Sequence, residues 1–268
     1  MRDSQVTGSI MLLAATWGTA SGFGTVQRKV VDVDGISRTY WQQDPSGTPP
    51  SAGWPVVLSF HGWCGTATAQ AASDSLRVKG AKSAIVIHPE GYSDPTDPGS
   101  YGPAGWQSFN GGGSAGAQAG GMDGPICQPD SVSSSGWQCY KSCKALGYCT
   151  DKCRWSHCLS DARFVHEILR TIPARDVNRT FATGHSNGAM LMYELARDPA
   201  SAPLLAAVAP VSGIPHNGFN VGSLSTDMRY LEVQGSHDSY VVPYSVRWAF
   251  KPRRIPRSPS PPSSLLAA

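Results

Sequence analysis

A serine flanked by glycines constrains the fold of this chain most. Gly184-His185-Ser186-Asn187-Gly188 lies between a β-like run, 180–183, and a helix-like run, 189–196. The two glycines let a strand turn sharply into a helix without Cβ clashes, and the turn holds the serine hydroxyl at the helix N-terminus. The pattern therefore predicts a strand–turn–helix unit with Ser186 as a nucleophile. A chance match in a glycine-rich loop is the alternative, because the chain has 29 glycines in 268 residues.

Apolar runs predict a buried parallel sheet around this turn. Three continuous runs, 56–58, 84–87 and 206–209, and a weaker fourth at 230–233 are typical of strands covered on both faces. Residues 161–172 carry an apolar helical face, with Ser160 as N-cap and Pro173 after its end. Alternating strands and helices indicate the α/β class.

The N-terminal part predicts an antiparallel hairpin. Residues 30–33 and 38–41 alternate like paired strands around Asp34-Gly35, a strong turn signal. We expect this hairpin at one edge of the mostly parallel sheet.

Four segments are predicted along the chain. Residues 1–22 have a signal-peptide layout, with Arg2, an apolar run at 10–17 and small residues at 18–22. Residues 23–250 are predicted to form one domain, and residues 251–268 a disordered, basic Pro/Ser-rich tail. Within the domain, residues 93–158 interrupt the alternation as a Cys-rich insertion. This insertion is either a binding surface or structural filler.

The charge distribution argues against nucleic acid as a partner. The net charge is +3, but the stretch from 247 to the end carries no acidic residue and five basic ones, Arg247, Lys251, Arg253, Arg254 and Arg257. The rest has 17 basic residues against 19 acidic ones. No apolar run reaches the roughly 18 residues that a membrane span needs.

Cysteine usage predicts a secreted protein. Six of the seven cysteines crowd into the insertion, as disulfide candidates Cys127, Cys139, Cys143, Cys149, Cys153 and Cys158. Asn178-Arg179-Thr180 is a glycosylation candidate at Asn178, which fits the same oxidising compartment. Zinc held by Cys149, Cys153 and His157 is the alternative. We expect disulfides, no metal and no other cofactor, while Cys64 makes the cysteine count odd.

Two further motifs supply partners for the serine. His61-Gly62-Trp63-Cys64-Gly65 follows the apolar run 56–60, which is the placement of an oxyanion loop. We predict that the oxyanion hole consists of the backbone N–H groups of Trp63 and Asn187. The acid candidate is Asp238, which follows a late strand as the order Ser, Asp, His requires. Asp227 competes, but it precedes that strand.

These motifs resemble the α/β-hydrolase group that contains polyhydroxyalkanoate depolymerases and feruloyl esterases. The matching stretches run from about 30 to about 250 and are His61-Gly62, 106–110, 161–169, 178–188, 235–238 and 241–244. The resemblance implies an α/β-hydrolase fold and a secreted carboxylic ester hydrolase with an acyl-serine mechanism. Its implied partners are ester substrates: plant phenolic esters, acetylated polysaccharides or polyesters.

The chain departs from this group in its histidines. The group carries its catalytic histidine tens of residues after the aspartate, and no histidine follows His237 here. We therefore expect a C-terminally truncated domain without the last strand and the histidine loop, with His216 as the one replacement base. A catalytically impaired secreted protein that binds glycan or aromatic ester ligands is the main alternative, and a serine peptidase or lipase on the same fold is a third.

Overall fold

A computed structural model describes residues 26–73, 76, 83–93, 107–109, 142, 157, 159–214, 225, 227–238 and 241. The predicted signal peptide, the six insertion cysteines, His216 and the basic tail lie outside the described residues.

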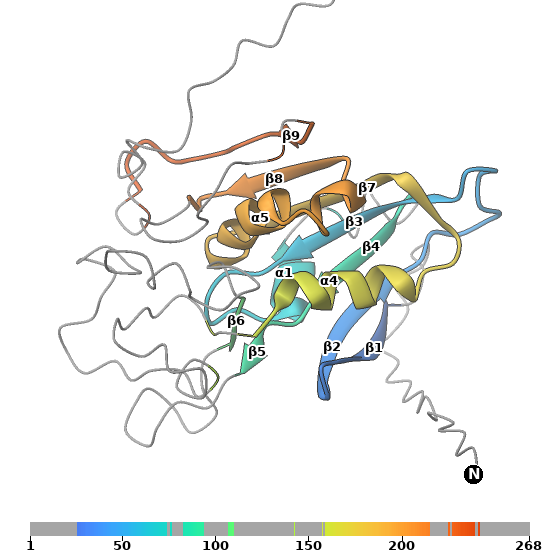
Figure 1. Ribbon diagram of the computed structural model, residues 1–268, viewed down its shortest axis with the longest axis horizontal. Helices are drawn as coiled ribbons and strands as arrows, with labels where there is room; N and C mark the ends of the chain where they lie inside the picture. The colour runs from blue at the N-terminus through green and yellow to red at the C-terminus, as the bar shows by residue number, and fades with distance from the viewer. Residues whose placement is uncertain are drawn as a thin grey trace, which may run out of the picture.

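One mixed sheet organises the described part of the chain (Figure 1). Its spatial order is β1 (Val26–Val33), β2 (Ile36–Gln43), β4 (Ile85–Pro89), β3 (Trp54–Phe60), β7 (Arg175–His185), β8 (Ala207–Val211) and β9 (Arg229–Tyr230). The first two pairings, β1 with β2 and β2 with β4, are antiparallel, and all the others are parallel. The predicted parallel sheet with an antiparallel edge is confirmed.

The hairpin at the edge forms for the reason that its turn residues suggest. Asp34 and Gly35 have φ angles of 57° and 80°, the left-handed values of a two-residue turn that matches strand twist. The Gly35 N–H also donates to Asp32 Oδ1 at 3.0 Å. The strands pair from Val33↔Ile36 to Val26↔Gln43.

The main core lies between the sheet and two helices, α4 (Asp161–Arg170) and α5 (Asn187–Arg197), which Figure 1 shows on one face. Alternate residues of the central strands point to this face, including Val56, Leu58 and Phe60 of β3. They pack against Phe164 and Leu191 of the two helices, all of them almost fully buried. The helix α1 (Ala67–Ser73) contacts the opposite face, where Gln70 Nε2 donates to Ser59 Oγ of β3 at 3.1 Å. In the described part of the chain, no helix is long and apolar enough to cross a membrane.

The helix predicted at 161–172 and the strand predicted at 230–233 are both shorter in the structure. Helix α4 has the predicted Ser160 cap but ends at Arg170, two residues early. The Thr171 hydroxyl donates to Ile168 O at 2.7 Å and closes the last turn, while Pro173 disfavours helical backbone at Ile172. The strand predicted at 230–233 is regular only in β9, and it continues as one bridge between Val211 and Val233.

A buried ion pair fixes the start of α4, where the insertion ends. Arg38 Nη2 of β2 lies 2.6 Å from Asp161 Oδ1, with both side chains almost fully buried. His157 Nε2 lies 3.2 Å from the other Asp161 oxygen, and the Arg38 guanidinium sits 4.2 Å from the centre of the Phe164 ring. Near the insertion's beginning, β5 (Tyr92–Ser93) pairs with β6 (Gln107–Ser108). Further along the chain, η3 (Ala202–Leu204) leads into β8.

This arrangement is the α/β-hydrolase fold. A mostly parallel sheet with covering helices carries a strand–serine–helix turn at the carboxyl end of its central strand β7. The fold class predicted from the sequence is confirmed.

Candidate active site

The predicted turn at Ser186 is present and strained. Ser186 has φ 52° and ψ −114° between the end of β7 and the first residue of α5. A methyl group on Gly184 would lie 2.4 Å from Gly188 C, and one on Gly188 would lie 2.6 Å from His61 O. Real Cβ atoms do not approach backbone so closely, so both glycines are required by the tight turn. The Ser186 N–H donates to Val211 O of β8 at 2.9 Å, which fixes the turn to the neighbouring strand.

Left-handed backbone gathers at this edge of the sheet. Among the described non-glycine residues, four have positive φ, and Asp34 belongs to the hairpin turn. The other three are Cys64 with φ 62°, Ser186 with φ 52° and Ser212 with φ 50°, in the turns after β3, β7 and β8. These three strands are neighbours and parallel, so their carboxyl ends meet at one edge. Such strain clusters at active sites, and this edge is where α/β folds bind ligands.

The predicted oxyanion loop touches the serine turn. A methyl group on Gly62 would lie 3.3 Å from Ser186 Cβ and 3.1 Å from His185 Nδ1. The loop turns back on itself, because the Gly65 N–H donates to Gly62 O at 3.0 Å. Trp63 therefore lies next to the nucleophile turn, as the sequence prediction of an oxyanion donor requires.

His61 supports this loop as a neutral imidazole. Its Nε2 accepts from the Gly91 N–H at 2.8 Å, so the proton is on Nδ1, which donates to Gly62 O at 2.7 Å. Burial lowers the pKa of His61 from 6.5 to about 4, although the Gly62 carbonyl and Asp161 act in the opposite direction. With both nitrogens engaged, His61 holds the loop and does not serve as a base.

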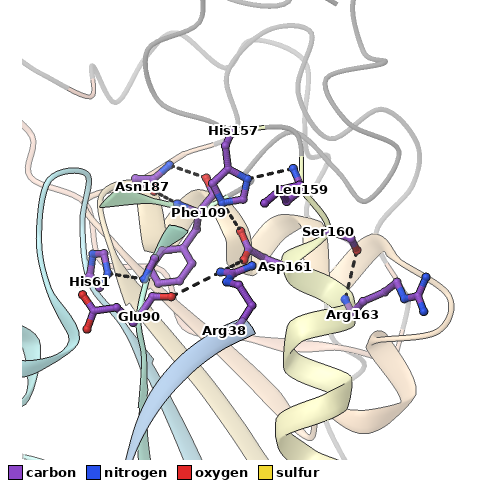
Figure 2. A network of polar contacts seen from close by, with 11 residues as sticks. Arg38, His61, Glu90, Phe109, His157, Leu159, Ser160, Asp161, Arg163 and Asn187 are labelled. Carbon is purple, nitrogen blue, oxygen red and sulfur yellow. Dashed lines mark hydrogen bonds and ion pairs between the residues drawn. The ribbon is translucent and has the colours of Figure 1, made fainter. Parts of the chain in front are cut away.

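Asn187, the second predicted donor, is the first residue of α5, where amides have no acceptor inside the helix. Its fully buried side chain pairs with the backbone of Phe109 in two hydrogen bonds. Asn187 Oδ1 accepts from the Phe109 N–H at 2.6 Å, and Asn187 Nδ2 donates to Phe109 O at 3.1 Å (Figure 2). The side chain thus ties the nucleophile turn to the insertion.

The acid candidate Asp238 lies in an ordered turn. Its Oδ1 accepts from the Val241 N–H at 2.9 Å, and its Oδ2 accepts from Gln234 Nε2 at 3.3 Å. The turn follows the bridge between Val233 and β8, so it lies on the carboxyl side of the sheet with Ser186. Asp227 precedes β9 and is on the amino side, which favours Asp238.

A small apolar cluster joins the loops of this edge. It contains Met190 from the first turn of α5, Ile214 from the segment after β8 and Val241 from the acid turn, each at most 3% exposed. Trp63 of the oxyanion loop packs against them. The segments predicted to supply the nucleophile, a donor and the acid therefore share one packing unit that is separate from the main core.

The described histidines do not include a partner of the nucleophile. In the described part of the chain, no hydrogen bond joins Ser186 Oγ to a histidine. His237 Nδ1 lies 2.9 Å from Ser236 Oγ, and His166 Nε2 lies 3.0 Å from Ser201 Oγ. His88 is buried within β4, and His216 lies outside the described residues.

The contacts of His157 do not favour it as a zinc ligand. Its Nδ1 accepts from the Leu159 N–H at 3.0 Å, and its Nε2 faces Asp161. Nδ1 is therefore engaged in a hydrogen bond, and Nε2 is directed at the Asp161 carboxylate, 3.2 Å away. The six insertion cysteines, by contrast, lie outside the described residues, so their pairing stays a prediction.

Three residues of the site were not found by sequence reasoning. Phe109 had a signal, because the stretch 106–110 belongs to the family resemblance. Gln234 and Ser212 had no signal. The Gln234 side chain donates to Asp238, four residues later, and Ser212 is distinguished only by its left-handed φ.

Comparison with known proteins gives structural neighbours only. No protein-family profile and no curated protein sequence matches this chain. Among solved structures, it is similar to the acetyl xylan esterase from Paenibacillus sp. R4, with TM-score 0.44 and 14% identity over 75% of this chain and 53% of that one. The acetyl xylan esterase from Aspergillus awamori has TM-score 0.49 and 16% identity over 82% of this chain and 75% of that one. A ferulic acid esterase has TM-score 0.39 and 14% identity over 70% of this chain and 60% of that one. The chain thus spans about half the length of the Paenibacillus enzyme.

Proposed function

We propose that the chain is a carboxylic ester hydrolase that acts through an acyl-serine. Ser186 Oγ attacks the ester carbonyl carbon, the alcohol leaves, and water then attacks the acyl-serine to release the acid. The N–H groups of Trp63 and Asn187 bind the negative oxygen of each tetrahedral intermediate. A base takes the proton of Ser186 Oγ and gives it to the leaving alcohol, and Asp238 orients a histidine in that role.

One observation carries this proposal: the strained Ser186 turn packs directly on the Gly62–Trp63 loop. Ser186 Cβ would lie only 3.3 Å from a methyl group on Gly62. A serine this close to a loop with backbone N–H groups suits acyl transfer. The oxygen of the ester carbonyl that the serine attacks needs hydrogen-bond donors within about 3 Å. Strained backbone at a serine is a feature of functional sites, which fits a nucleophile at this turn.

Of the three triad residues, the general base is the one not found among the described residues. No described histidine contacts Ser186 Oγ, and we propose that the described residues by themselves support only slow hydrolysis. Loss of one triad member lowers the rate by several orders of magnitude but leaves roughly 10³–10⁴-fold catalysis over water, which the oxyanion donors and binding supply.

The test is hydrolysis of p-nitrophenyl acetate with and without added imidazole. Wild-type protein should show a slow hydrolysis that imidazole accelerates, after the hydrolysis caused by imidazole alone is subtracted. The matched control, Ser186→Ala, should show neither effect at any imidazole concentration. Equal rates for wild type and Ser186→Ala would contradict the proposal and favour the binding protein.

A second variant tests the one replacement base. If His216 supplies the imidazole, then His216→Ala lowers the Ser186-dependent rate, and added imidazole restores it. If the base is absent, the variant hydrolyses the ester at the wild-type rate in both conditions.

We also propose that the protein is secreted. The side chain of Asn178 is exposed, so a glycan there is compatible with the fold. In a eukaryotic secretory host, an N-glycanase should raise the gel mobility of the wild type and leave Asn178→Gln unchanged. Identical mobility of both proteins before treatment would contradict use of this site.

A further inference from the structure

Phe109 of the insertion contacts the loops of both predicted oxyanion donors. Its backbone makes the two hydrogen bonds to the Asn187 side chain at the nucleophile turn. Its ring lies edge-on to Phe60, with the ring centres 5.1 Å apart, and tilted over the His61 imidazole at 4.6 Å. Figure 2 shows Phe109 between Asn187 and His61.

The contact with His61 leads to the first donor. His61 donates to Gly62 O, and Trp63 is the next residue. His61 also accepts from the Gly91 N–H, which directly precedes β5. β5 in turn pairs with β6, so that Tyr92 lies opposite Ser108, the residue before Phe109. A closed circuit of contacts therefore joins Phe109 to the oxyanion loop by two routes.

This circuit leaves little freedom between the two donors. Phe109 and Asn187 are fully buried, and His61 is 1% exposed. A polar group in this circuit that loses its partner has no water to replace it, so each bond holds its neighbour in place. Oxyanion donors must stay within a few tenths of an ångström of their productive positions.

We propose that Phe109 is a positioning residue that sets the placement of the Trp63 and Asn187 amides relative to each other, so that this one residue of the insertion supports the oxyanion hole. The role as oxyanion donors rests on the proposed function. The positioning itself does not, and it is testable in inactive protein.

The first experiment measures amide hydrogen exchange by NMR in Phe109→Ala. The Gly65 and Gly91 amides report on the loop, because they are hydrogen-bonded to Gly62 O and His61 Nε2. We expect their exchange to accelerate at least about tenfold relative to the β7 amides, because local opening no longer requires global unfolding.

Tyr40→Phe is the matched control. It removes another partly buried contact, the 2.8 Å hydrogen bond between Tyr40 and Thr171, without touching the circuit. In this variant, any change in the exchange rates of the Gly65 and Gly91 amides should equal the change for the β7 amides. Phe109→Leu keeps most of the volume and gives a smaller acceleration, so it serves where Phe109→Ala does not fold. Unchanged loop exchange in the folded variant would overturn the proposal.

The second experiment connects the positioning to catalysis. For Ser186-dependent hydrolysis of p-nitrophenyl acetate, Phe109→Leu should lower kcat about 10- to 100-fold and leave KM within about twofold, because misplaced donors weaken transition-state binding. Accelerated loop exchange with unchanged kcat would show that the circuit does not serve an oxyanion hole. No Ser186-dependent hydrolysis in the wild type refutes the proposed function, while the exchange result still decides the positioning.

Discussion

Acidification should destabilise this protein through His61. The imidazole is 1% exposed, and its pKa is lowered from 6.5 to about 4, chiefly by burial. Its Nε2 accepts the Gly91 N–H, so a proton added there removes that hydrogen bond and places a charge in the core. Folded protein therefore resists a proton that the unfolded chain accepts.

The sign and the size follow from the two pKa values. Below 6.5 the unfolded chain binds the proton at this position, whereas the folded protein binds it only near pH 4. The stabilisation is fully present above pH 6.5 and is lost as the pH falls to about 4. At about 1.4 kcal/mol for each pKa unit, the total loss is about 3 kcal/mol.

Urea unfolding of wild type and His61→Gln across this pH interval isolates the effect. Glutamine can accept from the Gly91 N–H and donate to Gly62 O, but it does not titrate. The wild-type free energy of unfolding should therefore fall by about 3 kcal/mol more than that of the variant between pH 6.5 and pH 4. A difference between the two proteins that stays constant with pH would refute the buried neutral imidazole.

Three comparisons of variants by urea unfolding test packing and backbone strain at and near the site. Gly188→Ala should cost about 1–3 kcal/mol, because its methyl would meet backbone at 2.6 Å, whereas Gly235→Ala, with 3.8 Å to its nearest neighbour, should cost little. Arg38→Met should cost about 3–5 kcal/mol by leaving the Asp161 carboxylate buried without its cation. Adding Asp161→Leu to it should recover part of this loss. Ser186→Gly should be about 1 kcal/mol more stable than Ser186→Ala, because only glycine relieves a φ of 52°.

Local sequence signals predicted the sheet and the serine turn well. The apolar runs became β3, β4 and β8. β4 is buried at every residue, so burial leaves a continuous signal there, whereas β8 is fully buried only at alternate residues. The turn around Ser186 was predictable because its two glycines are needed at fixed offsets in the sequence.

The contacts that assemble the site were not predictable in this way. Asn187 and Phe109 are 78 residues apart, and Arg38 and Asp161 are 123 apart. Arg38 stands between the polar residues Ser37 and Thr39, on the same strand face as the buried Tyr40, and the structure buries it over the Phe164 ring. Only tertiary packing decides that this guanidinium meets a carboxylate, and no local period or spacing encodes the pairing.

The structure bears separately on whether the serine turn is preserved and on whether this chain is active. If the serine turn no longer had a function, selection would not preserve its strained backbone. Each strained residue costs about 1–3 kcal/mol of stability, and substitutions at Ser186 would no longer be removed for loss of function. Here Ser186, Cys64 and Ser212 keep left-handed backbone on three neighbouring strands, and the Gly62 loop still packs on the serine. The segments of the proposed nucleophile and donors therefore keep the strained, closely packed backbone that the proposal requires. The activity of this chain depends on the one group that can take a proton from Ser186 Oγ.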